Sequence, residues 1–275
     1  MHSEKKPADA FGSLTANTAA GLVDHSSVAQ QVSAEEWALR VDLAAAYRLV
    51  AHFGWDDLIF THLSARVPGP ENHFLLNPLN LMFEEITASN LVKVDMEGHP
   101  VMATPYVTNP AGFVIHSALN MNRPDAHAVM HLHTPHGQAV SAHANGLLPL
   151  TQTAMAIGED LAFHDYEGIA VDLDERQRLV ADIGVRNLML LRNHGTLTVG
   201  ETVGEAFLRL YFLERACMAQ VLALSAGSEN LNLPNPGVAE LAARQGSSGV
   251  KAIANGFAWP ALLRKAFRLD PTFAT

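Results

Sequence analysis

Residues 123–142 have the sequence RPDAHAVMHLHTPHGQAVSA, which predicts a strand followed at once by a helix. Residues 127–133 (HAVMHLH) have an alternating pattern typical of a strand, in which side chains two residues apart lie on the same face of the sheet. His131 and His133 are therefore expected on the same face at the end of that strand. A threonine and a proline then supply the N-cap and the first position of a helix that we expect to run to about His143. The segment predicts two imidazoles beside a helix N-terminus, where backbone N–H groups favour negative charge.

Residues 188–207, LMLLRNHGTLTVGETVGEAF, predict a buried strand, a tight Asn-His-Gly turn, a short second strand and the start of a long helix. The helix opens at Thr202 and Glu205, which have the spacing of a capping box. His194 is the natural third partner of the two strand histidines, because side chains in loops at a sheet end can project toward a common point. Two interpretations stay open: a metal site, or histidines that only form hydrogen bonds at a strand end and in a turn.

The whole chain has 275 residues, with 14 histidines and one cysteine, Cys217. A single cysteine can form neither an internal disulfide nor a thiolate cluster, so a bound metal would need imidazole and oxygen ligands. The formal charge of −10 argues against nucleic acid as a partner, and the 48% apolar content argues against a disordered chain. The sequence has no uninterrupted apolar run of about 18 residues, so we expect no membrane span and a cytoplasmic protein.

Other patterns precede the histidine strand. Residues 33–54 predict a helix with a serine N-cap and a glycine at its end. Residues 58–67 and 73–78 alternate like the two strands of a hairpin, and residues 91–98 predict a further strand. Residues 109–124 predict a helix that is bounded by an asparagine-proline start and a final proline. Because strands and helices are mixed without strict alternation, we expect a mixed sheet flanked by helices.

The chain is expected to have three parts. Residues 1–34 predict a flexible N-terminal arm, residues 35–226 one domain, and residues 227–275 a C-terminal extension with short helices. In the extension, helical spacing places four apolar side chains on one stripe: Trp259, Leu262, Leu263 and Phe267. We expect this stripe to pack on the domain or on a neighbouring subunit; the alternative is a helix that binds a membrane or a partner.

The two histidine segments, in this order, resemble the class II aldolase/adducin family from about residue 35 to about residue 226. The resemblance implies a three-layer α/β/α sandwich with a central mixed, largely antiparallel sheet. It also implies a homotetramer with sites at the subunit interfaces. In the aldolases of the family, the corresponding histidines bind a divalent metal, so the resemblance implies this role for His131, His133 and His194. Zinc is the usual ion, with manganese, iron or cobalt as alternatives.

The sequence also departs from the sugar-phosphate aldolases of that family. Their catalytic glutamate corresponds to Gly112, which can neither accept a proton nor bind a metal. Loss of a general base typically costs about 10²–10⁴-fold in rate. The phosphate-binding loops of those aldolases are also changed in this sequence. Their glycine- and hydroxyl-rich segments are replaced by residues 61–64 (THLS), 78–80 (PLN) and 110–111 (PA). These departures favour an unphosphorylated substrate. Residues 61–69 (THLSARVPG) and 113–119 (FVIHSAL) instead resemble the adducin-like bacterial branch that retains the three metal-binding histidines.

Together these features predict a metal-dependent lyase, of decarboxylase or aldolase type, acting on a carbon–carbon bond in a small hydroxy acid, keto acid or carbonyl compound. Three imidazoles leave an open position on a metal for such a small-molecule substrate. Decarboxylation needs an electron sink but no base for a hydroxyl group. One alternative is a non-catalytic, adducin-like interaction module. A second is an iron(II)-dependent oxidative decarboxylase or dioxygenase, although those sites usually include a carboxylate ligand.

Further residues are candidates for the catalytic site and the substrate pocket. His62 stands where the aldolases have an asparagine of the phosphate loop, and it could contact a substrate carboxylate; a hydrogen-bonded strand histidine is the alternative. Tyr166 lies where the family has aromatic proton donors that act across a subunit boundary, although packing explains many tyrosines. We expect His136, Gln152 and Gly112 to line the substrate pocket.

Overall fold

The computed structural model describes residues 28–108, 116–120, 122–168 and 175–275. Its centre is a seven-stranded sheet in the order β3-β2-β1-β4-β7-β6-β5. The strands are β1 His62–Arg66, β2 Phe74–Leu76, β3 Val92–Val94, β4 Ala128–Leu132, β5 Leu161–His164, β6 Leu188–Leu191 and β7 Gly195–Gly200. All neighbours are antiparallel except β5 and β6, which are parallel. The expected mixed, largely antiparallel sheet is confirmed.

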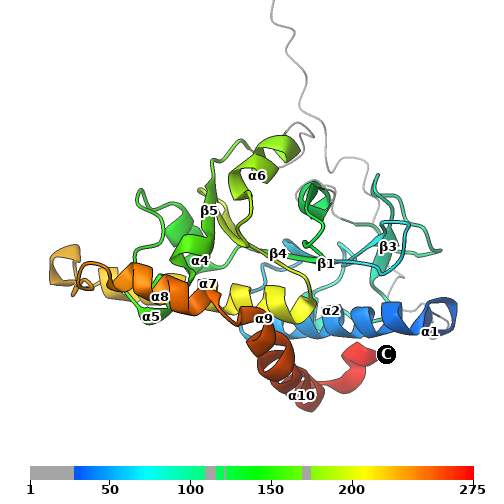
Figure 1. Cartoon of the computed structure of the whole chain (residues 1–275). Coiled ribbons are helices and arrows are strands. Elements are labelled where there is room, and N and C mark those ends of the chain that lie inside the picture. The colour runs from blue at the N-terminus through cyan, green and yellow to red at the C-terminus, as the bar shows by residue number, and fades with distance from the viewer. Residues whose placement is uncertain (1–27, 109–115, 121, 169–174) are drawn as a thin grey trace, which may run out of the picture.

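Helices cover both faces of this sheet (Figure 1). The α-helices are α1 Val28–Gln31, α2 Ala34–His52, α4 Pro135–Ser141, α5 Gln152–Ile157, α6 Glu175–Ile183, α7 Val203–Leu224, α8 Val238–Ser247, α9 Val250–Ile253 and α10 Trp259–Leu269. On one face, α2 and α7 form an apolar core with Met130 and Leu132 of β4. On the other face, α6 and the helical residues 116–120 pack with Val129. The alternation along β4 therefore directs His131 to the second face, as predicted.

Helix α2 begins and ends where the sequence predicts. The Ser33 side chain accepts a hydrogen bond from the Glu36 backbone N–H at 3.1 Å, which caps the helix. The chain leaves the helix through Gly54, whose φ of 67° suits glycine. The buried Tyr47 hydroxyl accepts a hydrogen bond from the Leu63 backbone N–H at 2.7 Å. This bond joins α2 to β1 and so fixes the strand beside β4.

The β1–β2 hairpin is confirmed, but its first strand is shorter than expected. β1 begins at His62, although the alternating pattern suggests a strand from residue 58. Leu58 and Thr61 have φ values of 53° and 66°, so the backbone turns twice before it joins the sheet. Leu58 and Phe60 are also exposed, since the alternation there does not correspond to a buried face.

Three elements have no clear signal in the sequence. They are α5, β5 and α6, of which β5 has only four residues and α6 only nine. Such short segments contain too few periods for a pattern to be distinct. β5 pairs with β6 and completes the sheet, and α6 lies between these two parallel strands in the chain. Their placement determines what surrounds the turn that contains His194.

The C-terminal extension packs on the domain. The Trp259 side chain is buried, and its Nε1 donates a hydrogen bond to Asp42 of α2 at 3.0 Å. A Cβ atom at Gly204 would lie 2.6 Å from Trp259, so a glycine in α7 permits this close approach. Leu262 and Leu263 also pack against this core, so the expected packing of the apolar stripe on the domain is confirmed for three of its four residues. Phe267 is 46% exposed and does not belong to the buried part of the stripe. Of the arm expected at residues 1–34, the structure describes residues 28–34, and within the described residues no helix is long and apolar enough to span a membrane.

Candidate metal site

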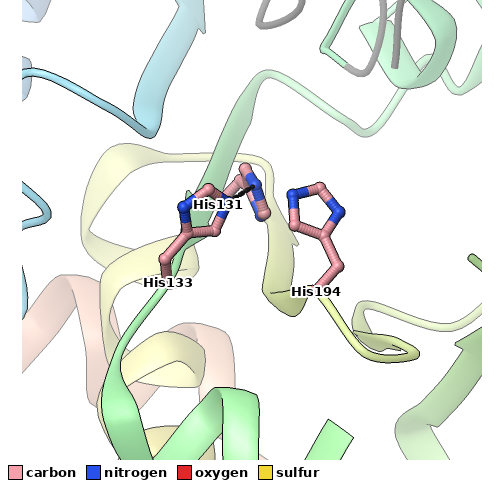
Figure 2. Close-up of side chains that lie close together, drawn as sticks. All are labelled: His131, His133 and His194. Carbon is pink, nitrogen blue, oxygen red and sulfur yellow. Dashed lines mark hydrogen bonds between the residues drawn. The ribbon is translucent and has the colours of Figure 1, made fainter. Parts of the chain in front are cut away.

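Three histidines meet at the end of β4 and in the turn before β7 (Figure 2). His131 is on β4, His133 follows that strand, and His194 lies in the turn between β6 and β7. One nitrogen of each ring lies within 4.8 Å of the corresponding nitrogens of the other two. The ring centroids are 4.7–4.8 Å apart. The structure thus brings together the three residues that the sequence predicts as metal ligands.

Strand pairing creates this meeting point. β4 is antiparallel to β7, with Leu132 opposite Thr196, so the start of β7 lies beside the end of β4. Because β6 and β7 are also antiparallel, the chain reverses in a tight turn in which Asn193 has a φ of 56°. A Cβ atom at Gly195 would lie 2.2 Å from the Leu132 carbonyl oxygen. Glycine is therefore required for the approach that places His194 beside the other two rings.

Hydrogen bonds at Nδ1 direct two Nε2 atoms toward each other. His131 Nδ1 donates to the Thr196 carbonyl oxygen at 2.9 Å, and His133 Nδ1 donates to Asp57 Oδ2 at 3.1 Å. With the Nδ1 protons used in this way, each neutral ring presents a lone pair at Nε2. The two Nε2 atoms are 3.0 Å apart, as the dashed line in Figure 2 marks. Two facing lone pairs repel each other unless a cation lies between them, so the donor set fits a metal ion.

Burial keeps two of the rings in the metal-binding form. Removal from water, together with the neighbouring histidines, lowers the pKa of His131 well below its ordinary value. The same desolvation, followed by the proximity of His133, lowers the pKa of His194 to about 4. An imidazole must be neutral to bind a metal. The fold therefore holds His131 and His194 ready to act as ligands at neutral pH.

Asp57 contacts the triad, although the sequence gives no signal for it. It lies in the loop between α2 and β1, 44% exposed at its side chain, and contacts His133 as described above. Histidines that bind metals commonly donate their other N–H group to a carboxylate, which fixes the tautomer and the ring orientation. An aspartate shortly before a strand is too common a feature to serve as a signal. The contact arises because β1, which follows Asp57, pairs with β4, which precedes His133.

His62, predicted as catalytic, lies in a buried polar patch beside the histidine triad. It is opposite His131 in the β1–β4 pairing, with ring centroids 5.4 Å apart. The ring of His116 lies 4.3 Å from that of His62 and forms a hydrogen bond with the Ser64 hydroxyl. Both nitrogens of His62 and Nε2 of His116 lack a partner among the described residues. Burial lowers the pKa of both histidines well below the ordinary value, so this patch is polar but uncharged.

Tyr166 and His136 lie at the periphery of the triad. Tyr166 follows β5; its side chain is 52% exposed, and its ring centroid is 6.0 Å from that of His194. His136 is half-buried in the first turn of α4, directly after His133 and its following Thr-Pro pair. Their catalytic and substrate-contacting roles remain predictions.

The structure describes one of the two remaining predicted pocket residues. Gln152 is exposed at the start of α5, and no hydrogen bond or ring contact in that part of the chain joins it to the three histidines. Gly112 lies outside the described residues, as do the neighbouring residues 110–111. Their contribution to a substrate pocket stays a prediction.

Comparison with known proteins agrees with this geometry. Residues 41–221 match the family described as Class II Aldolase and Adducin N-terminal domain. The chain belongs to the class II aldolase and adducin family. The matched residues include both histidine segments and the strands that position them. The family membership and the fold that the sequence predicts are therefore confirmed.

Relatives in this family include both aldolases and adducins. A Caulobacter vibrioides protein named for the class 2 aldolases is 56% identical over 254 residues, which cover 92% of this chain and 98% of the relative. Alpha-adducin of Rattus norvegicus is 46% identical over 204 residues, 72% of this chain but only 28% of the adducin. The chain thus corresponds to one part of that longer protein.

Solved structures show the same fold. An aldolase II superfamily protein from Pseudomonas syringae is 49% identical, with a TM-score of 0.84 over 90% of this chain and all of that one. An L-fuculose 1-phosphate aldolase from Glaciozyma antarctica is 29% identical, with a TM-score of 0.75 over 86% of this chain and 92% of that one. Class II aldolases typically depend on a divalent metal, and three histidines of this chain are arranged so that they could hold one.

Proposed function

We propose that this protein is a metal-dependent lyase that cleaves a carbon–carbon bond in a small, unphosphorylated hydroxy acid, keto acid or carbonyl compound. The observation that carries the proposal is the convergence of His131, His133 and His194, without a carboxylate in the same group among the described residues. Three side-chain ligands with one open position are typical of catalytic metal sites. A divalent ion bound there supplies a Lewis acid for a carbonyl oxygen that gains negative charge during cleavage.

The residues of this chain have separate roles in such a site. The three histidines hold the ion, while Asp57 and the Thr196 carbonyl oxygen orient two of the rings through their Nδ1 atoms. Imidazole ligands suit zinc, which we propose as the resident ion, and also iron. Cobalt and manganese are further alternatives. A homotetramer in the cytoplasm, with Tyr166 acting as a proton donor at a subunit boundary, completes the proposal.

The polar patch beside the triad supports an unphosphorylated substrate. The neutral ring of His62 offers one donor and one acceptor, and His116 adds its Nε2, unpaired within the described residues, whereas a phosphate dianion offers only acceptors. No Lys or Arg side chain forms an ion pair or a hydrogen bond with either ring in the described part of the chain. A hydroxyl or a protonated carboxyl group matches this patch better than a phosphate does. The similar Glaciozyma antarctica protein is, by its name, an aldolase of a sugar phosphate, so this chain is proposed to differ from it in substrate.

Gly112 favours decarboxylation over aldol cleavage. Aldol cleavage needs a base that removes a proton from a substrate hydroxyl, and glycine supplies none. Decarboxylation requires only that negative charge left on the substrate be stabilised. We therefore expect Gly112→Glu to change the metal affinity or the reactivity of the protein. An unchanged metal-binding profile in this variant would contradict the placement of residue 112 near the ion.

The proposal is tested by metal content and by reaction products together. Untagged full-length protein should contain a stoichiometric divalent metal in elemental analysis, and His131→Ala should lose it. The metal-loaded protein is then incubated with a panel of small 2-keto and hydroxy acids, and carbon dioxide release and new carbonyl products are followed by NMR. A folded protein that neither retains a divalent ion nor responds to His131→Ala would contradict the enzyme proposal.

A second candidate function is a non-catalytic interaction module. The 46% identity to alpha-adducin over 204 residues favours it. Metal content separates the two candidates, because a purely structural module does not require a bound ion. An iron(II)-dependent oxygenase is the third candidate, and consumption of oxygen by the iron-loaded protein in the presence of 2-keto acids would support it over the lyase.

A further inference from the structure

Glu214 is a buried carboxylate on α7 that lies behind the histidine triad. Its residue exposure is 3%, and burial raises its pKa. Among the described residues, no Lys, Arg or His forms an ion pair with it. Burying an ionisable group without a cationic partner costs free energy of folding, which indicates that the contacts of Glu214 have a function.

Each oxygen of Glu214 accepts a hydrogen bond from a threonine. Thr196 donates to Oε1 at 2.6 Å, and Thr134 donates to Oε2. Thr134 directly follows the candidate ligand His133 in the sequence. Thr196 lies two residues after His194, and its carbonyl oxygen accepts the hydrogen bond from His131 Nδ1. One carboxylate therefore joins the two chain segments that carry all three candidate ligands.

The surroundings leave these groups little freedom to move. The Thr134 hydroxyl also accepts the backbone N–H of Gly137 at 2.9 Å, as the N-cap of α4. A Cβ atom at Gly137 would lie 2.7 Å from Thr134 Oγ1 and 3.3 Å from Glu214 Oε1. Glycine thus lets α4 lie close against the carboxylate. The packing fixes the position of Thr134 and hence the backbone that leads out of His133.

We propose that Glu214 is a positioning residue for the metal ligands of this protein, acting through Thr134 and Thr196. This inference rests on the proposed function, because it assigns a role to residues around the same metal. The carboxylate accepts from both hydroxyls at once, so it holds the end of β4 and the start of β7 at one separation. An apolar side chain of similar volume would fill the space but leave both hydroxyls without an acceptor. A glutamine has only one acceptor oxygen and would present an NH₂ group to the second threonine.

The test compares metal affinity in matched variants of the full-length protein. Glu214→Gln should weaken zinc binding in competition with a chelating dye, by less than the about 10-fold to 100-fold that loss of a direct hydrogen-bond partner of a metal ligand typically costs, because Glu214 acts through the two threonines. It should also alter the visible absorption spectrum of the cobalt(II)-loaded protein, which reports the geometry of the ligands. Glu205→Gln is the control, since Glu205 is a buried glutamate on the same helix that contacts Arg209 and the Glu201 backbone instead. That control should lower stability without changing the affinity or the spectrum.

Thr196→Val is a second variant that removes one hydroxyl at the same contact and retains the carbonyl that holds His131. It should weaken zinc binding in the same direction and alter the cobalt(II) spectrum, and it keeps the test decisive if Glu214→Gln does not fold. If Glu214→Gln and Thr196→Val bind zinc with the wild-type affinity and give the wild-type cobalt(II) spectrum, the inference is overturned while the proposed function stands. A wild-type protein that binds no divalent ion would overturn both.

Discussion

The residues of the candidate site owe their chemistry to partners that are distant in sequence. His133 donates to Asp57 and His131 to the Thr196 carbonyl, which leaves the Nε2 atoms of both rings facing one point. Burial then lowers the pKa of His131 and His194, because the charged form loses its hydration. Tautomer, orientation and charge are thus set by contacts, whereas the spacing of the histidines only makes the meeting possible.

Asp57→Ala should weaken divalent-metal binding by about 10-fold to 100-fold, because His133 loses the carboxylate that orients its ring. Isothermal titration with zinc measures the change. Asp56→Ala is the matched control, since no hydrogen bond or ion pair in the described residues involves the neighbouring aspartate. Equal affinities for the two variants would show that the contact between Asp57 and His133 has no role in metal binding.

At the level of elements, the site depends on the separation of β4 and β7. The two strands pair from Ala128 opposite Gly200 to Leu132 opposite Thr196, and Gly195 begins β7 where His133 leaves β4. The pairing thus places His194, in the turn before β7, against His131 on β4 and His133 directly after it. A change in strand separation is expected to alter the site as well as the stability.

Gly195→Ala should destabilise the protein by about 1–3 kcal/mol, because the added Cβ would meet the Leu132 carbonyl oxygen 2.2 Å away. Urea unfolding gives the free-energy change, and metal affinity should fall in the same variant. Gly158→Ala serves as the control, because a Cβ atom added at Gly158 would enter open space and the φ of −61° suits alanine. It should change stability by no more than about 0.5 kcal/mol. If Gly158→Ala lowers the free energy of unfolding as much as Gly195→Ala does, the contact with the Leu132 carbonyl oxygen does not explain the loss.

The contact between β5 and α6 makes the stability of the protein depend on pH. His164 at the end of β5 contacts Glu175 at 3.4 Å and Asp182 at 2.7 Å, and these hydrogen bonds raise its pKa above 6.5. A raised pKa in the folded state adds stability below the unfolded pKa, and this contribution is lost as the pH rises through the folded value. His164→Gln should therefore cost roughly 1–2 kcal/mol at pH 6 and clearly less at pH 9.

Urea unfolding of the wild type and the His164→Gln variant at the two pH values measures this difference. His127→Gln is a suitable control, because His127 is an exposed histidine. Its difference from the wild type should be small at both pH values. A cost of His164→Gln that stays constant from pH 6 to pH 9 would contradict a stabilising charge on His164.

In the whole molecule, the C-terminal extension packs as part of the domain that carries the site. Trp259 packs beside Phe207 of α7, with ring centroids 5.7 Å apart, and donates its hydrogen bond to Asp42 of α2. Backbone bonds from Ala88 and Ser89 to the carbonyls of Phe273 and Thr275 join the last residues to the segment before β3. The extension therefore stabilises the helical layer on the face of the sheet opposite His131.

Trp259→Ala should destabilise the full-length protein by about 3–5 kcal/mol, because it leaves a cavity between α2, α7 and α10. Thermal and urea unfolding measure the loss. Phe257→Ala is the control in the same segment, since its side chain is 74% exposed and should contribute no more than about 0.5 kcal/mol. Similar effects of both substitutions would show that the extension is not packed as described.

Local patterns determine much of the fold. Ser33 and Gly54 bound α2, and Thr134 and Pro135 begin α4, because capping and φ preferences act within a few residues. Period-two alternation identifies β4 and the face on which His131 lies. The sequence departs from the structure at Leu58 and Thr61, where a turn with positive φ interrupts an alternating pattern, and at β5, which is too short to give one.

The sequence by itself determined the three candidate ligands, because His131, His133 and His194 lie at spacings that strands and a turn can bring together, and because the segments around them resemble a known family. Only the tertiary structure decided that Asp57 and Glu214 belong to the same site. These two residues are 157 positions apart (214 − 57), and neither has a distinctive local motif. Hydrogen bonds across a sheet depend on strand order and register, which the pairing of distant segments sets and which no local pattern encodes.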